Sequence, residues 1–174
     1  MHLTKNSKMK NENVMSELEK LIRTERPDLL RYASYKLGNV DDAEDAIQDS
    51  YLNVHSKIKT NGVSGIENLR CYLFRTLSNI CNTRVAKRSK ITAVSVDECD
   101  LPDESTDDFQ EEYKRISMLL SQLPDEQAEV IRLRMYGGNS FAQIAGILSV
   151  PLPTVKSRFL YGLEKIRKGF KKDF

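Results

Sequence analysis

The stretch that decides the fold runs from Ser140 to Phe159 and reads SFAQIAGILSVPLPTVKSRF. Ser140 is a residue type that begins helices, because its hydroxyl accepts a hydrogen bond from a backbone N–H of the first turn. Ile144 and Leu148 follow at helical spacing, and the small Ala145 leaves room for a second helix to pass closely. A turn that contains proline then precedes another helical pattern. The stretch therefore predicts a helix-turn-helix, two short helices that cross at a steep angle.

The second helix of this stretch has polar and cationic side chains on the faces that its core residues leave free. Val155 and Phe159 are spaced to anchor it from beneath. Hydroxyls and cations on the other faces can reach phosphates and base edges in a major groove. The candidate DNA-binding residues are Thr154, Lys156, Ser157, Arg158 and Tyr161. The local pattern leaves open a plain helical hairpin with solvated lysines, but seven basic residues between positions 156 and 172 favour DNA.

Helical periods continue through the rest of the chain. Gly 8 and Pro 5 among 174 residues are too few for a turn-rich β-sandwich or barrel. We therefore predict an all-α fold. Pro27 marks a break in the first helix, or the first turn of a second one. The expected helices cover residues 14–37, 40–58, 67–88, 109–122, 125–136, 140–148 and 154–170, with a loop at residues 59–65.

The net charge of +2 conceals charges that are sorted into blocks along the chain. Residues 70–90 carry six basic side chains and no acidic one, whereas residues 97–112 carry nine acidic side chains and no basic one. Two basic faces separated by an acidic segment suggest two modules that meet a polyanion. We therefore predict two small helical domains joined by a flexible acidic linker. The first domain covers residues 1–90, the linker 91–108, and the helix-turn-helix domain 109–174.

Several function classes lack the residues that they need. Cys71, Cys81 and Cys99 are an odd number without the close pairing of a zinc site, so we expect reduced thiols, no metal and no cofactor. The sequence has no constellation of nucleophile and base, and we expect no catalytic residue and no enzyme. No apolar run approaches the roughly 20 residues that cross a bilayer, and the start lacks the apolar middle of a signal peptide. We expect a cytoplasmic protein without membrane insertion.

Residues 29–58, LLRYASYKLGNVDDAEDAIQDSYLNVHSKI, resemble region two of the bacterial sigma factors, specifically of the short extracytoplasmic-function (ECF) group that keeps only regions two and four. Residues 120–168 resemble region four. The mark of region two is an Asp-Ala-Glu-Asp core followed by Gln and an acidic residue. The resemblance implies that this acidic helix docks on core RNA polymerase through Asp42, Glu44, Asp45, Gln48 and Asp49. Composition alone leaves open that the carboxylates merely favour a helix N-terminus through its macrodipole.

The basic helix that follows resembles the part of region two that opens and reads the minus-ten promoter element. A melted strand needs cations along its backbone and flat or amide groups at its bases. The implied contact residues are Arg70, Tyr72, Arg75, Asn79, Arg84, Lys87 and Arg88. Asn79 matches an Asn that the family uses near a captured base. Tyr72 stands where many members have Trp, and an aromatic on a helix is more often a core residue than a stacking platform.

The chain departs from the family pattern in places that bear on base preference. The loop at residues 59–65 lacks the aromatic residue that several members carry just before the basic helix. Pro153 replaces the usual Gly before the recognition helix, and Leu152 stands where a polar cap is common. The specificities at the minus-ten and minus-thirty-five elements therefore do not carry over by analogy.

The resemblance predicts a sigma factor that directs core RNA polymerase to promoter DNA for transcription initiation, with the helix-turn-helix reading the minus-thirty-five element. It also implies an anti-sigma factor as a partner. The alternative function is a helix-turn-helix transcription regulator without a polymerase-docking role, whose first domain binds an effector or dimerises.

Overall fold

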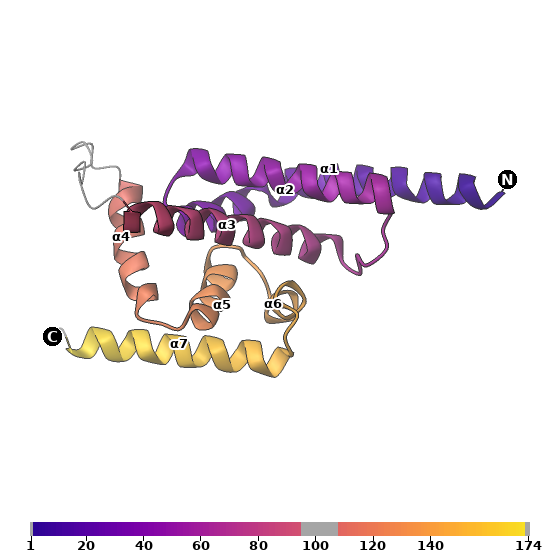
Figure 1. Cartoon of the computed structure of the whole chain (residues 1–174). Helices are drawn as coiled ribbons and strands as arrows, with labels where there is room; N and C mark the ends of the chain where they lie inside the picture. The colour runs from indigo at the N-terminus through magenta and orange to yellow at the C-terminus, as the bar shows by residue number, and fades with distance from the viewer. Residues whose placement is uncertain (1, 95–107, 173–174) are drawn as a thin grey trace.

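The computed structural model describes residues 2–94 and 108–172, and every regular element in these ranges is an α-helix. This confirms the predicted all-α fold. The helices are α1 (His2–Leu37), α2 (Val40–Asn61), α3 (Leu69–Val94), α4 (Asp108–Ser121), α5 (Asp125–Met135), α6 (Phe141–Leu148) and α7 (Leu152–Lys172). Figure 1 shows α1, α2 and α3 as one layer, α5 and α6 beneath α3, and α7 along the opposite edge. We call α1–α3 the N-terminal half and α4–α7 the C-terminal half.

Two local signals set the reversal between α1 and α2. Gly38 follows the last residue of α1 and takes a positive φ of 73°, a conformation that favours glycine. Asn39 then caps α2, since its side-chain oxygen accepts a hydrogen bond of 2.9 Å from the backbone N–H of Asp42. The reversal lets α2 pack along α1 and bury Ala43 and Ile47.

The predicted break at Pro27 does not occur. Pro27 lies inside α1, which runs unbroken from His2 to Leu37. A proline inside a helix removes one backbone hydrogen bond and costs about 3 kcal/mol in an isolated helix. Leu29 and Tyr32 directly after it are fully buried. Their burial offsets the local cost, since each large apolar side chain contributes roughly 1.5–3 kcal/mol.

The helix α3 is longer than the sequence pattern indicates. It runs to Val94, so residues 91–94 of the predicted linker are helical. The remaining linker residues, 95–107, lie outside the described part of the chain. The domain limits at residues 90 and 109 and the flexible linker therefore stay predictions.

The predicted helix-turn-helix is present as α6 and α7. Ser140 and Gln143 form a reciprocal cap at the start of α6. The Ser140 hydroxyl accepts from the Gln143 N–H at 3.1 Å, and the Gln143 side-chain oxygen accepts from the Ser140 N–H at 2.8 Å. Val155 is fully buried, and Phe159 packs edge-on against Phe141 with ring centroids 5.1 Å apart. The predicted anchors of the second helix are confirmed.

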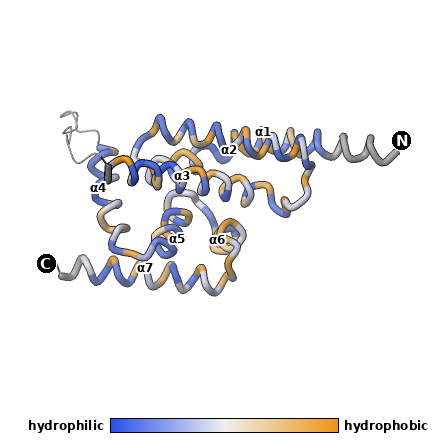
Figure 2. Tube along the Cα trace, in the orientation of Figure 1, coloured by the Kyte–Doolittle hydropathy of each residue, from blue (hydrophilic) through white to orange (hydrophobic). Residues whose placement is uncertain are grey.

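The two halves share one hydrophobic core. Phe74 and Leu77 of α3 belong to the same buried cluster as Leu133 of α5 and Ile144 and Ile147 of α6. Figure 2 shows hydrophobic residues along α6 where it lies beneath α3. A smaller cluster within the C-terminal half consists of Leu120, Leu123, Ala128 and Ile131. The described chain is therefore one body, in which α5 and α6 lie between the N-terminal half and α7.

Candidate functional site

A buried charge cluster joins the two halves. Glu129 of α5 lies among Tyr32 and Lys36 of α1 and Ser78 of α3. Its Oε2 is 2.6 Å from the Lys36 ammonium, and its Oε1 accepts hydrogen bonds from the Tyr32 hydroxyl and, at 2.9 Å, from the Ser78 hydroxyl. The side chains of Lys36 and Glu129 are only 6% and 13% exposed. The carboxylate of one half is thus satisfied by donors from the other.

The electrostatics of this cluster maintain a charged pair. Burial alone raises the pKa of Glu129, but the charge of Lys36 and hydrogen bonds from Lys36 and Tyr32 outweigh it and hold the pKa below 4.5. Burial lowers the pKa of Lys36 from 10.5, and the Glu129 carboxylate opposes part of that shift. Burial, and next the Glu129 charge, raise the pKa of Tyr32 well above 10.0. The Tyr32 hydroxyl therefore remains a donor to Glu129 at neutral pH.

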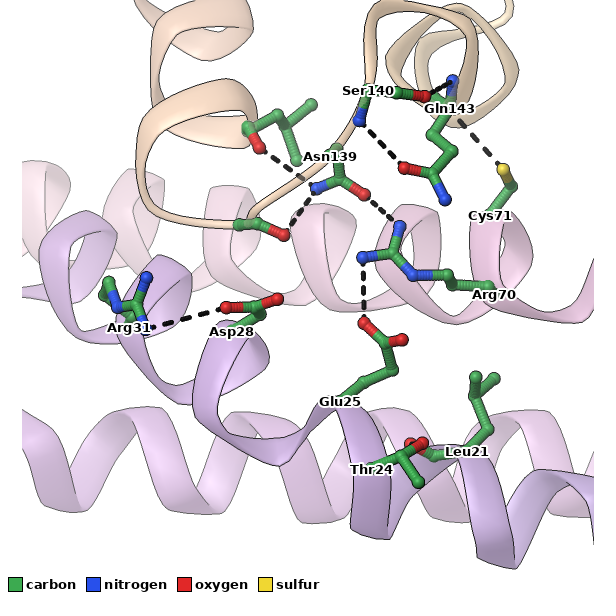
Figure 3. Close-up of polar contacts among 12 residues, drawn as sticks. Leu21, Thr24, Glu25, Asp28, Arg31, Arg70, Cys71, Asn139, Ser140 and Gln143 are labelled. Atoms are coloured by element: carbon green, nitrogen blue, oxygen red, sulfur yellow. Dashed lines mark hydrogen bonds and ion pairs between the residues drawn. The ribbon is translucent and has the colours of Figure 1, made fainter.

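Two of the predicted minus-ten residues bind the C-terminal half. The Arg70 guanidinium pairs with Glu25 at 2.8 Å and donates to the side-chain oxygen of Asn139 (Figure 3). It also lies over the Phe74 ring, 4.6 Å from the centroid. Asn139 is fully buried in the turn before α6. Arg75 donates from Nε to the carbonyl oxygen of Ile147 at 3.0 Å and from Nη2 to that of Gly146 at 2.5 Å. In this arrangement both guanidiniums donate hydrogen bonds to α6 or the turn before it.

Two further predicted minus-ten cations pair with the predicted polymerase-docking face. Arg84 contacts the carboxylate of Asp49 at 2.6 Å and the carbonyl oxygen of Asp42 at 3.0 Å. Arg88 pairs with the Asp42 carboxylate and donates to the carbonyl oxygen of Leu37 at 2.7 Å. The sequence assigns these residues to separate surfaces, but α2 and α3 lie side by side and their charges meet.

The predicted docking residues fall into two groups. Asp42 and Asp49 pair with α3, and Glu44 pairs with Arg26 at 2.6 Å. Asp45 and Gln48 are exposed. Their side chains form no ion pair or hydrogen bond with another residue in the described ranges 2–94 and 108–172. They are therefore the members of the acidic set that are free to meet a partner.

A groove between α2 and α3 brings together the remaining minus-ten candidates. It has a volume of about 530 Å³ and is lined on the α3 side by Tyr72, Asn79, Arg84 and Lys87. Tyr72 also packs against the buried core, so its ring both lines the groove and contacts core residues. Sequence reasoning missed Asn53, Thr76 and Thr83, which also line the groove.

The predicted minus-thirty-five residues lie on α7, which Figure 1 shows on the side away from the N-terminal half. Lys156 and Tyr161 are exposed, and Thr154 is partly buried. The Ser157 hydroxyl donates to the carbonyl oxygen of Thr154 at 3.0 Å. Arg158 pairs with Glu126 of α5 at 2.7 Å. Lys156 and Tyr161 therefore face solvent, whereas Arg158 is engaged within the C-terminal half.

Glu129 and Asn139, which lie between the halves, were not identified from the sequence. A signal for Glu129 existed in its partner. Lys36 follows Leu29, Tyr32 and Ala33 at helical spacing and so falls on the apolar stripe of α1. A lysine on such a stripe needs a buried acidic partner.

Neither a membrane helix nor a metal cluster is found in the described residues. No helix there is long and apolar enough to cross a bilayer. No group of three or more His, Cys, Asp or Glu side chains in that part of the chain could hold a metal ion. Cys71 and Cys81 are free thiols, and Cys99 lies outside the described residues.

A helix-turn-helix joined to a helical layer with a polar, cationic groove defines a DNA-binding transcription protein. The comparisons with known proteins agree. Residues 21–91 match the family Sigma-70 region 2, and residues 119–168 match Sigma-70, region 4. The chain is 33% identical over 143 residues to the ECF RNA polymerase sigma factor SigL of Mycobacterium tuberculosis, covering 80% of each chain. It is 27% identical to the ECF sigma factor SigW of Bacillus subtilis, covering 76% of this chain and 77% of that one. The chain belongs to the sigma-70 family, in the ECF group of RNA polymerase sigma factors.

Two solved structures share the fold. One is CnrH in complex with the cytosolic domain of CnrY, with a TM-score of 0.69 and 17% identity over 97% of this chain and 96% of that one. The other is the sigma factor RpoE of Bartonella quintana in complex with the anti-sigma factor NepR, with a TM-score of 0.62 and 22% identity over 91% of this chain and 99% of that one. The predicted function as a transcription initiation factor is confirmed, and the alternative of an ordinary regulator is not favoured.

Proposed function

We infer that this sigma factor has three separate contact surfaces, one for core polymerase and two for promoter DNA. The exposed part of α2 around Asp45 and Gln48 docks on core RNA polymerase. The groove between α2 and α3 takes the melted strand of the minus-ten element, and the outer face of α7 contacts the minus-thirty-five element as duplex. Core polymerase works in the cytoplasm, so we place the protein there.

The composition of the groove carries this proposal. Bases that leave the helical stack need flat or amide groups, and their phosphates need cations. The groove gathers the ring of Tyr72, the amides of Asn53 and Asn79, and the cations of Arg84 and Lys87 along one surface. None of its lining residues comes from α5 or α6, so a strand can enter it while those helices stay packed.

The exposed face of α2 supports its assignment as the polymerase-docking surface. Asp45 and Gln48 lie three residues apart and therefore face the same direction on the helix. An exposed carboxylate beside an amide suits a basic partner surface. Leu52, one turn further on, is 52% exposed and adds apolar area to the same face.

A protein inhibitor is the fourth proposed contact. The neighbour structures hold the cytosolic domain of CnrY and the anti-sigma factor NepR. On α7 of the present chain, Leu160, Tyr161 and Leu163 are 64%, 60% and 40% exposed. An exposed apolar patch of this kind is typical of a protein contact, and we propose that an anti-sigma factor covers it.

The test is reconstitution with core polymerase on a library of random duplex DNA. The full-length chain should bind the polymerase, the complex should enrich a two-part sequence, and permanganate should detect unpaired thymines at its downstream part. A chain that binds duplex DNA alone but not the polymerase would instead be an ordinary helix-turn-helix regulator.

A further inference from the structure

We propose that the free sigma factor is held closed by its own C-terminal half, which covers part of the minus-ten surface, and that Glu129 is the residue that fastens it. The closed state is the arrangement in which α5 and α6 pack beneath α3. The inference rests on the proposed function only for the role of Arg70 and Arg75 in DNA binding. The contact between the halves is itself observed.

Glu129 is suited to this role because its three nearest partners come from the other half, whereas Arg132 of its own helix lies farther away, at 3.6 Å. Tyr32 and Lys36 of α1 and Ser78 of α3 converge on its two oxygens. A buried carboxylate without such partners is costly in free energy. The packing of α5 is therefore favoured in the position that brings Glu129 to all three of these partners. When the halves separate, water replaces these donors, and both charges of the Lys36 pair regain hydration.

In the closed state, Arg70 and Arg75 are not free to contact DNA. Arg75 donates to the carbonyl oxygens of Gly146 and Ile147 in the last turn of α6, groups that a helix end leaves without internal partners. Arg70 is bound to Asn139 and Glu25. The guanidiniums that would contact phosphate are thus used to hold the helix-turn-helix in place.

The end of α6 also covers the surface beside Tyr72. A cavity of about 290 Å³ is lined by Asn68, Tyr72 and Arg75 of the N-terminal half and closed on the other side by Gly146 and Ser149. A base or sugar next to Tyr72 would meet α6 from this side. The outer groove with Asn79 and Lys87 remains open in the same state.

The geometry of a promoter requires the halves to part. Elements named for positions about 25 base pairs apart lie roughly 85 Å apart along B-form DNA, at about 3.4 Å per base pair. The longest element of the closed body, α1 with 36 residues, spans about 54 Å. We therefore expect the halves to part when both elements are engaged. Its α2 face stays exposed, so docking on polymerase can precede opening.

The closed state can be fixed covalently, because Gly146 of α6 faces Cys71 of α3. A Cβ at position 146 would lie 3.7 Å from the Cβ of Cys71, within the range of about 3.5–4.5 Å found in disulfides. The trap variant carries Gly146→Cys and Cys99→Ser, so that Cys71 is the accessible partner thiol. The matched control also carries Cys71→Ser. Cys81 is fully buried in both.

The free full-length trap variant is oxidised, the oxidant is removed, and core polymerase is added with a promoter duplex selected by the parent holoenzyme. We expect the disulfide to form in the free chain. Promoter melting should then fall about tenfold or more, because the competent open state is no longer populated. Reductant should restore it, and the control should be insensitive to oxidation.

The outcomes distinguish a failure of the closure inference from a failure of the proposed function. If no disulfide forms in the free chain, or if the oxidised trap melts the promoter as well as the reduced trap, closure is not inhibitory and the inference is wrong. If parent and reduced trap bind no polymerase and melt no DNA, the proposed function fails. Disulfide formation then still decides whether the free chain is closed.

The role of Glu129 has its own comparison in the trap background. Glu129→Gln keeps the shape and removes the charge, and we expect disulfide formation to slow by about tenfold. Glu126→Gln is the matched control, since Glu126 lies one turn earlier on α5 and pairs with Arg158 inside the C-terminal half. Equal rates for Glu129→Gln and the trap would remove Glu129 from closure.

Discussion

Arg75 of α3 and Ile147 of α6, 72 residues apart in the chain, are joined by a hydrogen bond of 3.0 Å from the arginine Nε to the isoleucine carbonyl oxygen. The sequence assigns Arg75 to promoter DNA, and the structure places Ile147 in the buried core. If Arg75 contacts the minus-ten strand as we propose, this contact couples strand capture to the packing of the helix-turn-helix. A change that frees Arg75 from α6 also loosens the C-terminal half.

The buried pair of Lys36 and Glu129 gives a prediction for stability. Lys36→Met removes the nearer counter-charge of the Glu129 carboxylate and leaves Arg132 at 3.6 Å. Breaking a buried pair in this way costs about 3–5 kcal/mol. The double variant Lys36→Met with Glu129→Leu replaces both charges by apolar groups and should regain most of that loss. Urea denaturation of the three proteins at neutral pH measures the effect. A single variant as stable as the parent would show that the pair is not buried in solution.

The same pair predicts a pH dependence. The pKa of Glu129 is held below 4.5 in the folded state, chiefly by Lys36 and Tyr32 acting against burial. Its contribution to stability is therefore present above pH 4.5 and is lost as the pH falls through the lowered pKa. Burial raises the pKa of the neighbouring Tyr32 and Cys81, so neither group titrates in that acidic range.

The free energy of unfolding of the parent minus that of Glu129→Gln measures this contribution. It should be constant from about pH 6 to pH 8 and should shrink below pH 4.5. A difference that does not change on acidification would place the Glu129 carboxylate in water.

Asn79 is predicted to act after the promoter melts. Asn79→Ala should weaken the open complex by about 1 kcal/mol or more, because an amide bound to an unstacked base has no substitute there. Binding of the closed promoter complex should change less. Asn82→Ala is the control, since Asn82 is an exposed amide of the same helix that lies outside the groove. Permanganate reactivity compares the two, and equal losses in closed and open complexes would give Asn79 a structural role.

Lys156 is predicted to contact phosphate. It is exposed on α7, so Lys156→Ala in the holoenzyme should weaken all promoter sequences together and reduce the salt slope by about one. Lys114→Ala, an exposed lysine of α4, is the control with the same loss of charge. Binding titrations at several salt concentrations provide the slopes. An unchanged slope for Lys156→Ala would mean that α7 lies on the duplex in another orientation.

Much of the fold follows from local sequence signals. Ser140 starts α6 as predicted, and the structure adds Gln143 to its cap. Gly38 and Asn39 set the turn after α1. Caps are predictable because they depend on residues close in sequence. The break predicted at Pro27 is wrong, because α1 continues through it. The prediction uses a local rule, whereas the helix is stabilised by burial of Leu29 and Tyr32 in tertiary packing.

The candidate sites were less predictable, for a physical reason. Sequence gives the charge of Arg84 and Asp49 but not that α2 and α3 bring them within 2.6 Å. The partners of Arg70 and Arg75 lie about 70 residues away, 69 for Asn139 and 72 for Ile147. Such contacts depend on how the halves pack, which no periodicity within one helix encodes.

The measurement that tests the central claim most directly is the affinity of Asp45→Arg for core RNA polymerase. Asp45 is exposed and unpaired among the described residues, so the substitution should change the free energy of unfolding by less than about half a kcal/mol. Glu19→Arg, the same charge change at an exposed site of α1, is the control. We predict that Asp45→Arg loses several kcal/mol of binding energy through like charges at the docking surface, while Glu19→Arg binds like the parent. Parental affinity of Asp45→Arg for core polymerase would contradict the docking role of α2.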